Sequence, residues 1–297
     1  MKLVDAETMR MLDRRAIQEE GIPEAVLMQR AGLGIADAVE RLALMHQVID
    51  SSILMLAGMG NNGGDVFVAA RYLWERDIEV NVRLAGRVSS LKGAAEAAYQ
   101  FAKESEVPIE SCPDDADWTD APEADILVDG LLGTGFSGEP RGVMKAALAW
   151  ADAYAERSLV VAVDLPSAKA VRADVTVALG LPKKESVAAD QVDLTGRIEV
   201  VDIGIPERFI EATGEAETEL ITDSDVAPLL LRRQRNSHKG VYGHLHCIGG
   251  SLGMSGAMVL TARAGLRGGA GWVSVRVPAS VVEGVASCVP EAMVQVG

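Results

Sequence analysis

The stretch Met55-Leu-Ala-Gly-Met-Gly-Asn-Asn-Gly-Gly-Asp65 decides how the rest of the chain is interpreted. An apolar run enters it at residues 53–57 and a run of helical character leaves it at residues 66–74, which predicts a strand, a glycine-rich turn and the start of a helix. Glycines allow a ligand to approach the backbone closely. The N–H groups at a helix start favour an anionic group such as a phosphate. An ordinary tight turn is the alternative, although two asparagines and an aspartate are more polar side chains than such a turn requires.

Two helices are predicted before this turn. Asp5 is a suitable N-cap of the first helix, which Gly21 ends, and Pro23 occupies the first turn of the second. The second helix carries small residues beside its apolar stripe, namely Ala31, Gly32 and Gly34. Close packing against another element explains them most simply, and closure of this helix over a ligand is the second interpretation.

After the turn, apolar β-branched runs alternate with helical segments. Strands are expected at 79–85, 125–132, 159–165, 173–179 and 198–203, and helices at 91–103 and 142–156. Continuous apolar strands separated by helices are typical of a parallel sheet covered on both faces. The predicted fold class is therefore α/β, a doubly wound Rossmann-like three-layer sandwich.

The amino-acid composition and net charge exclude some classes of function. The chain has 297 residues, 48% hydrophobic and 24% charged, which fits a globular protein with a sizeable core. Its net charge of −15 argues against a nucleic-acid partner, which would require a basic face. Neither a signal peptide nor a membrane span is expected. Cys112, Cys247 and Cys288 are widely spaced, so we expect no disulfide framework or zinc site and a cytoplasmic setting.

The character of the chain changes near residues 223–235, where three arginines interrupt an acidic sequence. A new strand follows at 243–248, then a glycine-rich turn, a helix at 257–266 and a strand at 272–277. We therefore predict two domains, residues 1–228 and 229–297. One βαβ unit does not bury its own faces, so the second segment is expected to be the opening part of a larger domain.

Polar residues follow three of the predicted strands. The glycine-rich turn follows the first, Asp129 and a second glycine-rich loop follow another, and Asp164-Leu-Pro-Ser167 follows a third. Ligands of open α/β sheets bind outside the carboxyl ends of the strands, so we expect these segments to converge. The second loop contains Gly133-x-Gly135-x-x-Gly138, but a lone dinucleotide-type match in mid-domain is weak evidence.

The polar side chains at these strand ends suit two functions, cation binding and proton transfer. Oxygen atoms of Asn62, Asp129 and Ser167 could hold a hard cation. A cap or buried hydrogen bond is the alternative for Asp129, and a turn position is the alternative for Ser167. Asp164, at the end of a buried strand, is a candidate for a raised pKa and for proton transfer. His244-x-His246 has no third ligand nearby and is rejected as a metal site.

Several motifs, in order, resemble the YjeF N-terminal domain, the NAD(P)HX epimerase. They are Leu12-Asp-Arg-Arg-Ala-Ile17, Leu27-Met-Gln-Arg-Ala-Gly32, Gly60-Asn-Asn-Gly-Gly-Asp65, Asp129-Gly-Leu-Leu-Gly-Thr-Gly135, Val163-Asp-Leu-Pro-Ser167 and Val200-Val-Asp-Ile-Gly-Ile-Pro206. The segments 236–240, 248–257 and 267–271 resemble the start of the ribokinase-like, ADP-dependent NAD(P)HX dehydratase. This order is similar to that of the bifunctional bacterial repair enzymes.

The resemblance implies a small-molecule substrate, hydrated NADH or NADPH (NADHX, NADPHX), whose two epimers the epimerase interconverts. It implies that the dinucleotide is lined by Asn61, Asn62, Gly63, Gly64, Asp65, Gly133, Thr134, Gly135, Phe136, Ser137, Gly138 and Glu139. It further implies substrate contact and catalysis by Asp164, potassium binding by Asn62, Asp129 and Ser167, and dehydratase substrate contact by Ala257. A homo-oligomer is possible, and no membrane partner is expected.

The sequence departs from the family pattern in two places. Ala168-Lys-Ala170 runs straight into Val171-Arg-Ala-Asp174, where the family usually has a glycine and an acidic, glycine-containing loop. The later dehydratase motifs are also missing, so we expect no dehydratase activity from this chain and a use for ADP or ATP only if that domain were complete. The rival functions are a non-catalytic nucleotide- or protein-binding module and a flavodoxin-like or plain nucleotide-binding protein.

Overall fold

The computed structural model describes residues 1–48, 51–113, 118, 120–136, 138–214, 218–230 and 232–297. They form two compact units, Met1–Thr222 and Asp223–Gly297. The predicted domain boundary, after residue 228, falls within the short helix η4 (Ala227–Leu229), which follows α8 (Asp223–Val226). Within the described residues, no helix has the length and apolar character needed to cross a bilayer.

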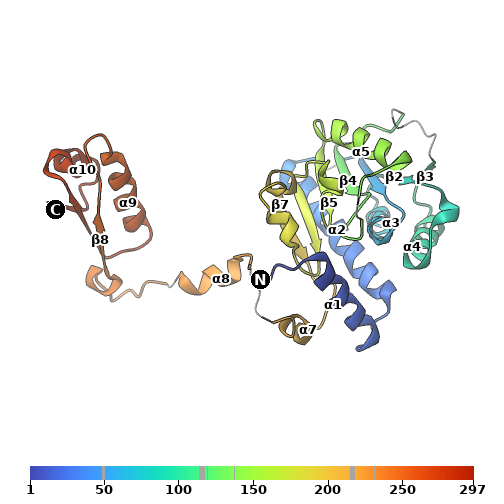
Figure 1. Ribbon diagram of the computed structural model, residues 1–297, viewed down its shortest axis with the longest axis horizontal. Coiled ribbons are helices and arrows are strands. Elements are labelled where there is room, and N and C mark those ends of the chain that lie inside the picture. The colour runs from blue at the N-terminus through green and yellow to red at the C-terminus, as the bar shows by residue number, and fades with distance from the viewer. Residues whose placement is uncertain (49–50, 114–117, 119, 137, 215–217, 231) are drawn as a thin grey trace. The chain divides into compact units, whose positions relative to one another are not determined.

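The first unit is built on a parallel seven-stranded sheet with the order β3-β2-β1-β4-β5-β6-β7 (Figure 1). The strands are β1 (Ile53–Ala57), β2 (Val80–Ala85), β3 (Ile109–Cys112), β4 (Ile126–Gly130), β5 (Leu159–Val163), β6 (Val175–Leu179) and β7 (Arg197–Val201). The chain reverses its direction of travel across the sheet between β1 and β4, and this switch point creates a crevice beyond their carboxyl ends. The predicted doubly wound α/β fold is confirmed.

One strand of the first unit, β3, was not predicted from the sequence. The edge strand β3 exposes Glu110 and Ser111 and has only Cys112 fully buried. A short edge strand of this kind has no continuous apolar run, because only one side of it pairs and little of it reaches the core.

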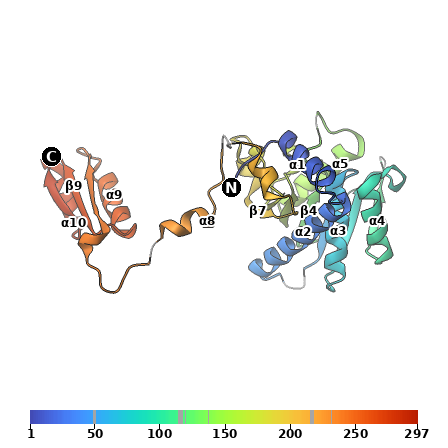
Figure 2. The same cartoon turned by 90° about the horizontal axis from the view of Figure 1, so that it is seen from below.

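Helices cover both faces of the sheet, as the two views in Figures 1 and 2 show. One face packs against α2 (Glu24–His46), α3 (Asn61–Trp74) and α4 (Gly93–Glu104), and the other against α5 (Gly142–Ala155). Side chains of β1 alternate between these layers: Met55 joins the core on the α2 and α3 side, and Leu56 joins the core on the α5 side. Every residue of β1 is buried, as expected for a central parallel strand.

The N-terminal helices show the cap and the close packing that the sequence predicts. In α1 (Ala6–Gln18), the carboxylate of Asp5 accepts a hydrogen bond from the Thr8 N–H at 2.8 Å, as its predicted capping role requires. Gly32 of α2 allows close approach to α3, because a Cβ there would overlap the side chain of Val68. The packing interpretation of the small residues in α2 is therefore supported.

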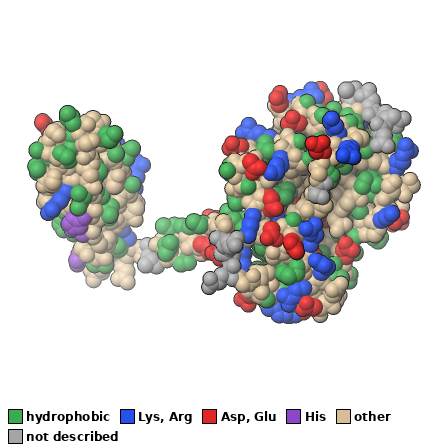
Figure 3. Space-filling model, viewed as in Figure 1, with side chains coloured by type: hydrophobic (Ala, Val, Ile, Leu, Met, Phe, Trp, Pro, Cys, Tyr) green, Lys and Arg blue, Asp and Glu red, His purple; other side chains and the backbone are tan. Residues whose placement is uncertain are grey.

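The second unit contains a parallel three-stranded sheet in the order β10-β9-β8. Its elements are β8 (His244–Ile248), α9 (Ser255–Arg267), β9 (Trp272–Val277), α10 (Val282–Cys288) and β10 (Met293–Val296). Its small core includes Cys247, Met258 and Val275, whereas the other residues of β8 are exposed. The face of this unit seen in Figure 3 accordingly carries many hydrophobic and few charged side chains.

Candidate functional site

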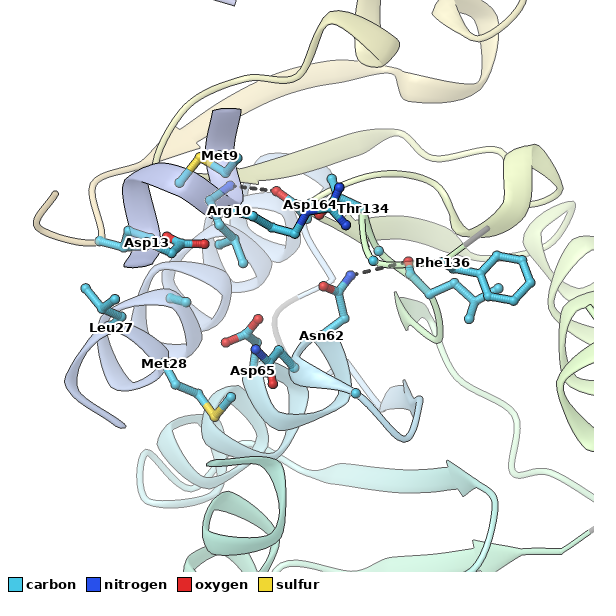
Figure 4. A pocket seen from close by; sticks show the side chains of 18 of the residues that line it. Met9, Arg10, Asp13, Leu27, Met28, Asn62, Asp65, Thr134, Phe136 and Asp164 are labelled. Atoms are coloured by element: carbon cyan, nitrogen blue, oxygen red, sulfur yellow. Dashed lines mark hydrogen bonds between the residues drawn. The ribbon is translucent and has the colours of Figure 1, made fainter. Parts of the chain in front are cut away.

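A cavity of about 490 Å³ opens at the carboxyl edge of the first unit's sheet. Its walls come from the loops after β1, β4, β5 and β6 and from the facing sides of α1 and α2 (Figure 4). Segments that lie far apart in the sequence therefore meet at the switch point between β1 and β4, where ligands of doubly wound sheets bind.

Most of the expected substrate-binding residues line this cavity. Those in its wall are Asn61, Asn62, Asp65, Gly133, Thr134, Gly135, Phe136 and Asp164. Gly138 and Glu139 are exposed and lie outside the lining, and Ser137 lies outside the described residues. Ala257 is exposed near the start of α9 in the second unit.

Gly63 and Gly64 lie behind the cavity wall, buried within the first turn of α3. A Cβ on Gly63 would overlap the carbonyl oxygen of Gly58, and a Cβ on Gly64 would lie 2.6 Å from the methyl carbon of Met28. These glycines shape the start of α3 by allowing close packing. The N-cap position, Gly60, makes no side-chain capping hydrogen bond, so the first-turn N–H groups are suited to an anionic group.

The three residues expected at a cation site meet around the backbone of Leu132. The Leu132 N–H donates to Ser167 Oγ at 2.9 Å, and Asn62 Nδ2 donates to the Leu132 carbonyl at 3.3 Å. Ser167 also donates twice to Asp129, from its Oγ at 2.6 Å and from its N–H at 2.9 Å. Asn62 Nδ2 donates to the carbonyl of Val163 at 2.9 Å, which ties the start of α3 to the end of β5.

This group of residues fits a potassium ion. Asp129 is fully buried, burial raises the pKa of its carboxyl, and the hydrogen bonds described for it come from the neutral groups of Leu131 and Ser167. A monovalent cation would offset its charge. Rotation of the Asn62 amide would exchange its nitrogen and oxygen, so that the oxygen would lie where Nδ2 now faces the Leu132 and Val163 carbonyls. Amide, hydroxyl and carboxylate oxygens suit such a cation. No three His, Cys, Asp or Glu side chains gather as metal ligands within the described residues.

Asp164 has an unusual backbone conformation and a buried partner. Its φ is 68°, in the left-handed region that non-glycine residues rarely occupy. Its carboxylate forms an ion pair with Lys183 and accepts a hydrogen bond from the Leu179 N–H at 3.2 Å. Lys183 Nζ also donates to the carbonyl of Leu179 at 2.8 Å. Such strain persists only where the surrounding structure enforces it and is common at functional sites.

The segment that follows Ser167 also adopts strained geometry. Ala168 and Lys169 have φ values of 53° and 56°, and Lys169 pairs with Asp190 at 2.6 Å. Two consecutive non-glycine residues in the left-handed region allow the chain to turn tightly after the Ser167–Asp129 contact.

Lys183 and Asp13 belong to the cavity wall but were not identified as site residues from the sequence. Lys183 follows β6 by a few positions. Ligands bind beyond the carboxyl ends of parallel strands, so applying this rule to the segment after β6 would have identified it. Asp13 lies on α1, where Met9, Asp13 and Ile17 recur every four residues and all face the cavity. A carboxylate within an apolar helical stripe was the available signal.

The electrostatics of the cavity are set by buried carboxyl groups. Burial, followed by the nearby Asp164 and Asp13, raises the pKa of Asp65 well above its usual value. Burial also raises the pKa of Asp13 to about 6, although Lys183 opposes this shift. The cavity thus contains two carboxyl groups with raised pKa values beside the Asp164–Lys183 ion pair, an arrangement suited to proton transfer.

Comparison with known proteins assigns the chain to a family. Residues 24–185 match the family described as YjeF-related protein N-terminus. The chain belongs to this family. It is 38% identical over 296 residues to a bifunctional NAD(P)H-hydrate repair enzyme of Moorella thermoacetica, covering 95% of this chain and 55% of that protein. A protein of the same name from Coxiella burnetii is 36% identical over 297 residues, covering 96% of this chain and 58% of the relative.

The chain spans about half the length of the curated relatives it matches. The YjeF-related fold is also seen in the crystal structure of the yeast protein ynu0, with a TM-score of 0.63 and 22% identity, covering 76% of this chain and 98% of the yeast chain. This likeness supports the fold.

Proposed function

We propose that the first unit is an NAD(P)HX epimerase that interconverts the R and S forms of hydrated NADH and NADPH. The observation that carries this proposal is a single cavity that joins a glycine-rich helix start to the buried Asp164–Lys183 pair. Relatives that match nearly the whole chain are named NAD(P)H-hydrate repair enzymes, which supports the choice of substrate.

The two ends of the cavity suit different parts of a dinucleotide. The first turn of α3 offers backbone N–H groups, and the loop at 133–136 adds the hydroxyl of Thr134 and the half-exposed ring of Phe136. These features suit the pyrophosphate and a flat ring. The acidic part of the cavity, at Asp164, suits the altered nicotinamide ring, which carries no negative charge.

Epimerisation requires the carbon–oxygen bond to break and to form again on the other face of the ring. The lone pair of the ring nitrogen expels the hydroxyl group when an acid protonates it, and water then adds with the help of a base. The cation formed on the ring between these steps is stabilised by the carboxylate of Asp164, a buried residue. Asp164 is the group proposed to transfer protons.

A potassium ion would be held by Asn62, Asp129 and Ser167. When bound, it would supply positive charge beside the buried Asp129 carboxylate and the substrate phosphates. The protein residues themselves already link the loops after β1, β4 and β5 through Leu132 and Val163. These hydrogen bonds fix the positions of the two glycine-rich loops relative to the loop that carries Asp164.

The second unit resembles the start of the dehydratase, with Ala257 as a proposed substrate contact. That these 297 residues do not by themselves catalyse ATP- or ADP-dependent dehydration stays a prediction. Separate incubations of the chain with NADHX and either ADP or ATP, followed by measurement of NADH at 340 nm, test it, since formation of NADH above the protein-free rate with either nucleotide would contradict it.

The rival proposal is a non-catalytic binding module on the same fold. The decisive experiment incubates the whole chain with one purified NADHX epimer and separates the epimers by chromatography. We expect interconversion well above the protein-free rate, a loss of about 10²–10⁴-fold in Asp164→Asn, and unchanged activity in Asp152→Asn, which alters an exposed carboxylate of α5. Substrate binding without interconversion by the unaltered chain would favour the binding module.

A further inference from the structure

We propose that Asp13 is a second catalytic residue of the epimerisation, acting on the face of the ring opposite to the face served by Asp164. This inference rests on the proposed function and deepens it, because an epimerase must handle a hydroxyl group on either face of its substrate.

The position of Asp13 supports this role. Asp13 extends from α1 toward the cavity, whereas Asp164 enters from the end of β5, and Figure 4 shows the two carboxyl groups on different walls. Asp13 Oδ1 is buried and has no hydrogen-bond partner within the part of the chain that the structure describes. A buried carboxyl oxygen without a partner is energetically costly and calls for a functional explanation. A bound hydroxyl group or water would supply the missing hydrogen bond.

The two carboxyl groups differ in a way that separates their roles. Asp164 Oδ1 already accepts from Lys183 and from the Leu179 N–H, so one oxygen of this carboxyl group is engaged by the protein itself. Asp13 has no such donor on Oδ1. The charged groups that act on Asp13 are Asp164 and Glu24 of α2, with Lys183 opposing them, and Asp13 in turn raises the pKa of Asp65. Its raised pKa, about 6, leaves part of the population protonated near neutral pH.

Conversion of one epimer into the other proceeds in two steps. The Asp13 carboxyl gives its proton to the departing hydroxyl oxygen while the C–O bond breaks, and the ring nitrogen's lone pair forms a C=N bond. Water then attacks from the opposite face, forming the new C–O bond. Its proton passes to the Asp164 carboxylate, and the C=N electrons return to nitrogen. Asp13 ends deprotonated and Asp164 ends protonated, and exchange with bulk water restores both. The reverse direction uses the two groups in exchanged roles.

The test separates interconversion from oxygen exchange in water labelled with ¹⁸O. In Asp13→Asn we expect interconversion to fall by about 10²–10⁴-fold. Label should still enter one epimer, whose hydroxyl faces Asp164, because water can leave and return on that face. In Asp164→Asn the label should enter the other epimer instead. Glu7→Gln, which alters an exposed carboxylate of the same helix, should behave as the unaltered chain.

The outcomes are distinguishable. Interconversion by Asp13→Asn at the unaltered rate, or the same labelling pattern in both variants, would overturn the role of Asp13 while leaving the epimerase proposal intact. Failure of the unaltered chain to interconvert the epimers would instead overturn the proposed function. Retained binding of NADHX by Asp13→Asn, measured by calorimetry, shows that the variant is folded, and the labelling pattern then decides its role.

Discussion

Asp164, held at a φ of 68°, forms an ion pair with Lys183, whose side chain is 1% exposed. Lys183 also bonds the carbonyl of Leu179, so the pair joins the end of β5 to the end of β6. A buried lysine requires such a partner, since an unpaired ammonium group in the protein interior is strongly destabilising. The pair therefore belongs both to the fold and to the proposed chemistry.

Removal of Lys183 should consequently affect stability. We expect Lys183→Met to lower the free energy of unfolding by roughly 3–5 kcal/mol, because it leaves the Asp164 carboxylate buried without its cation. The double variant Lys183→Met/Asp164→Asn should recover part of this loss. Urea denaturation measures both, with Lys145→Met on the exposed surface of α5 as the matched control. A double variant no more stable than Lys183→Met would contradict a direct coupling between the two groups.

The contact between the two glycine-rich loops gives a second prediction. The Gly58 N–H donates to the carbonyl of Gly130 at 3.0 Å, and a Cβ on Gly58 would overlap the carbonyl oxygen of Leu131. Gly58→Ala should therefore destabilise the protein by roughly 1–3 kcal/mol. Gly60, on the same loop, has nothing within 4 Å of an added Cβ and a φ of −102°. Gly60→Ala is the matched control and should change stability by less than about 0.5 kcal/mol.

The proposed potassium site predicts a dependence of stability on the cation. A ligand that binds only the folded state at 100 times its dissociation constant stabilises by about 2.7 kcal/mol. We expect a higher Tm in potassium chloride than in tetramethylammonium chloride of equal ionic strength. This difference should disappear in Asp129→Asn and persist in Asp152→Asn. Equal Tm values for the unaltered chain in the two salts would argue that hydrogen bonds alone satisfy Asp129.

The fold was predictable because most of its strands form recognisable apolar runs in the sequence. β1 and β5 are uninterrupted apolar runs, and β4 and β6 are apolar apart from Asp129, Gly130 and Thr176. The helices that alternate with most of the strands indicate a parallel sheet. β3 was missed because an exposed edge strand needs no apolar pattern. The register and order of the strands depend on packing between distant segments, which no local pattern encodes.

Part of the site was predictable for the same reason. Asn62, Asp164 and Ser167 follow strands and Asp129 lies near the end of β4, so the rule that ligands bind beyond the carboxyl ends of strands identifies all four. Asp13 belongs to a helix that precedes the sheet in sequence, and only the tertiary structure brings α1 against the cavity. The pairing of Lys183 with Asp164 was likewise not predictable. The two residues lie on loops after different strands, and no sequence pattern links the two segments.

The raised pKa of Asp13 predicts how stability varies with pH. Because the folded state raises this pKa from 3.8 to about 6, it binds the proton more tightly than the unfolded chain does. The stabilising contribution of the protonated group is fully present below about pH 4 and is lost as the pH rises through about 6, a change of about 3 kcal/mol. Asp13→Asn mimics the protonated form at every pH. Urea denaturation should therefore find it more stable than the unaltered chain at pH 8, with an advantage that shrinks toward pH 4, and a constant difference between the two proteins over this range would contradict the assignment.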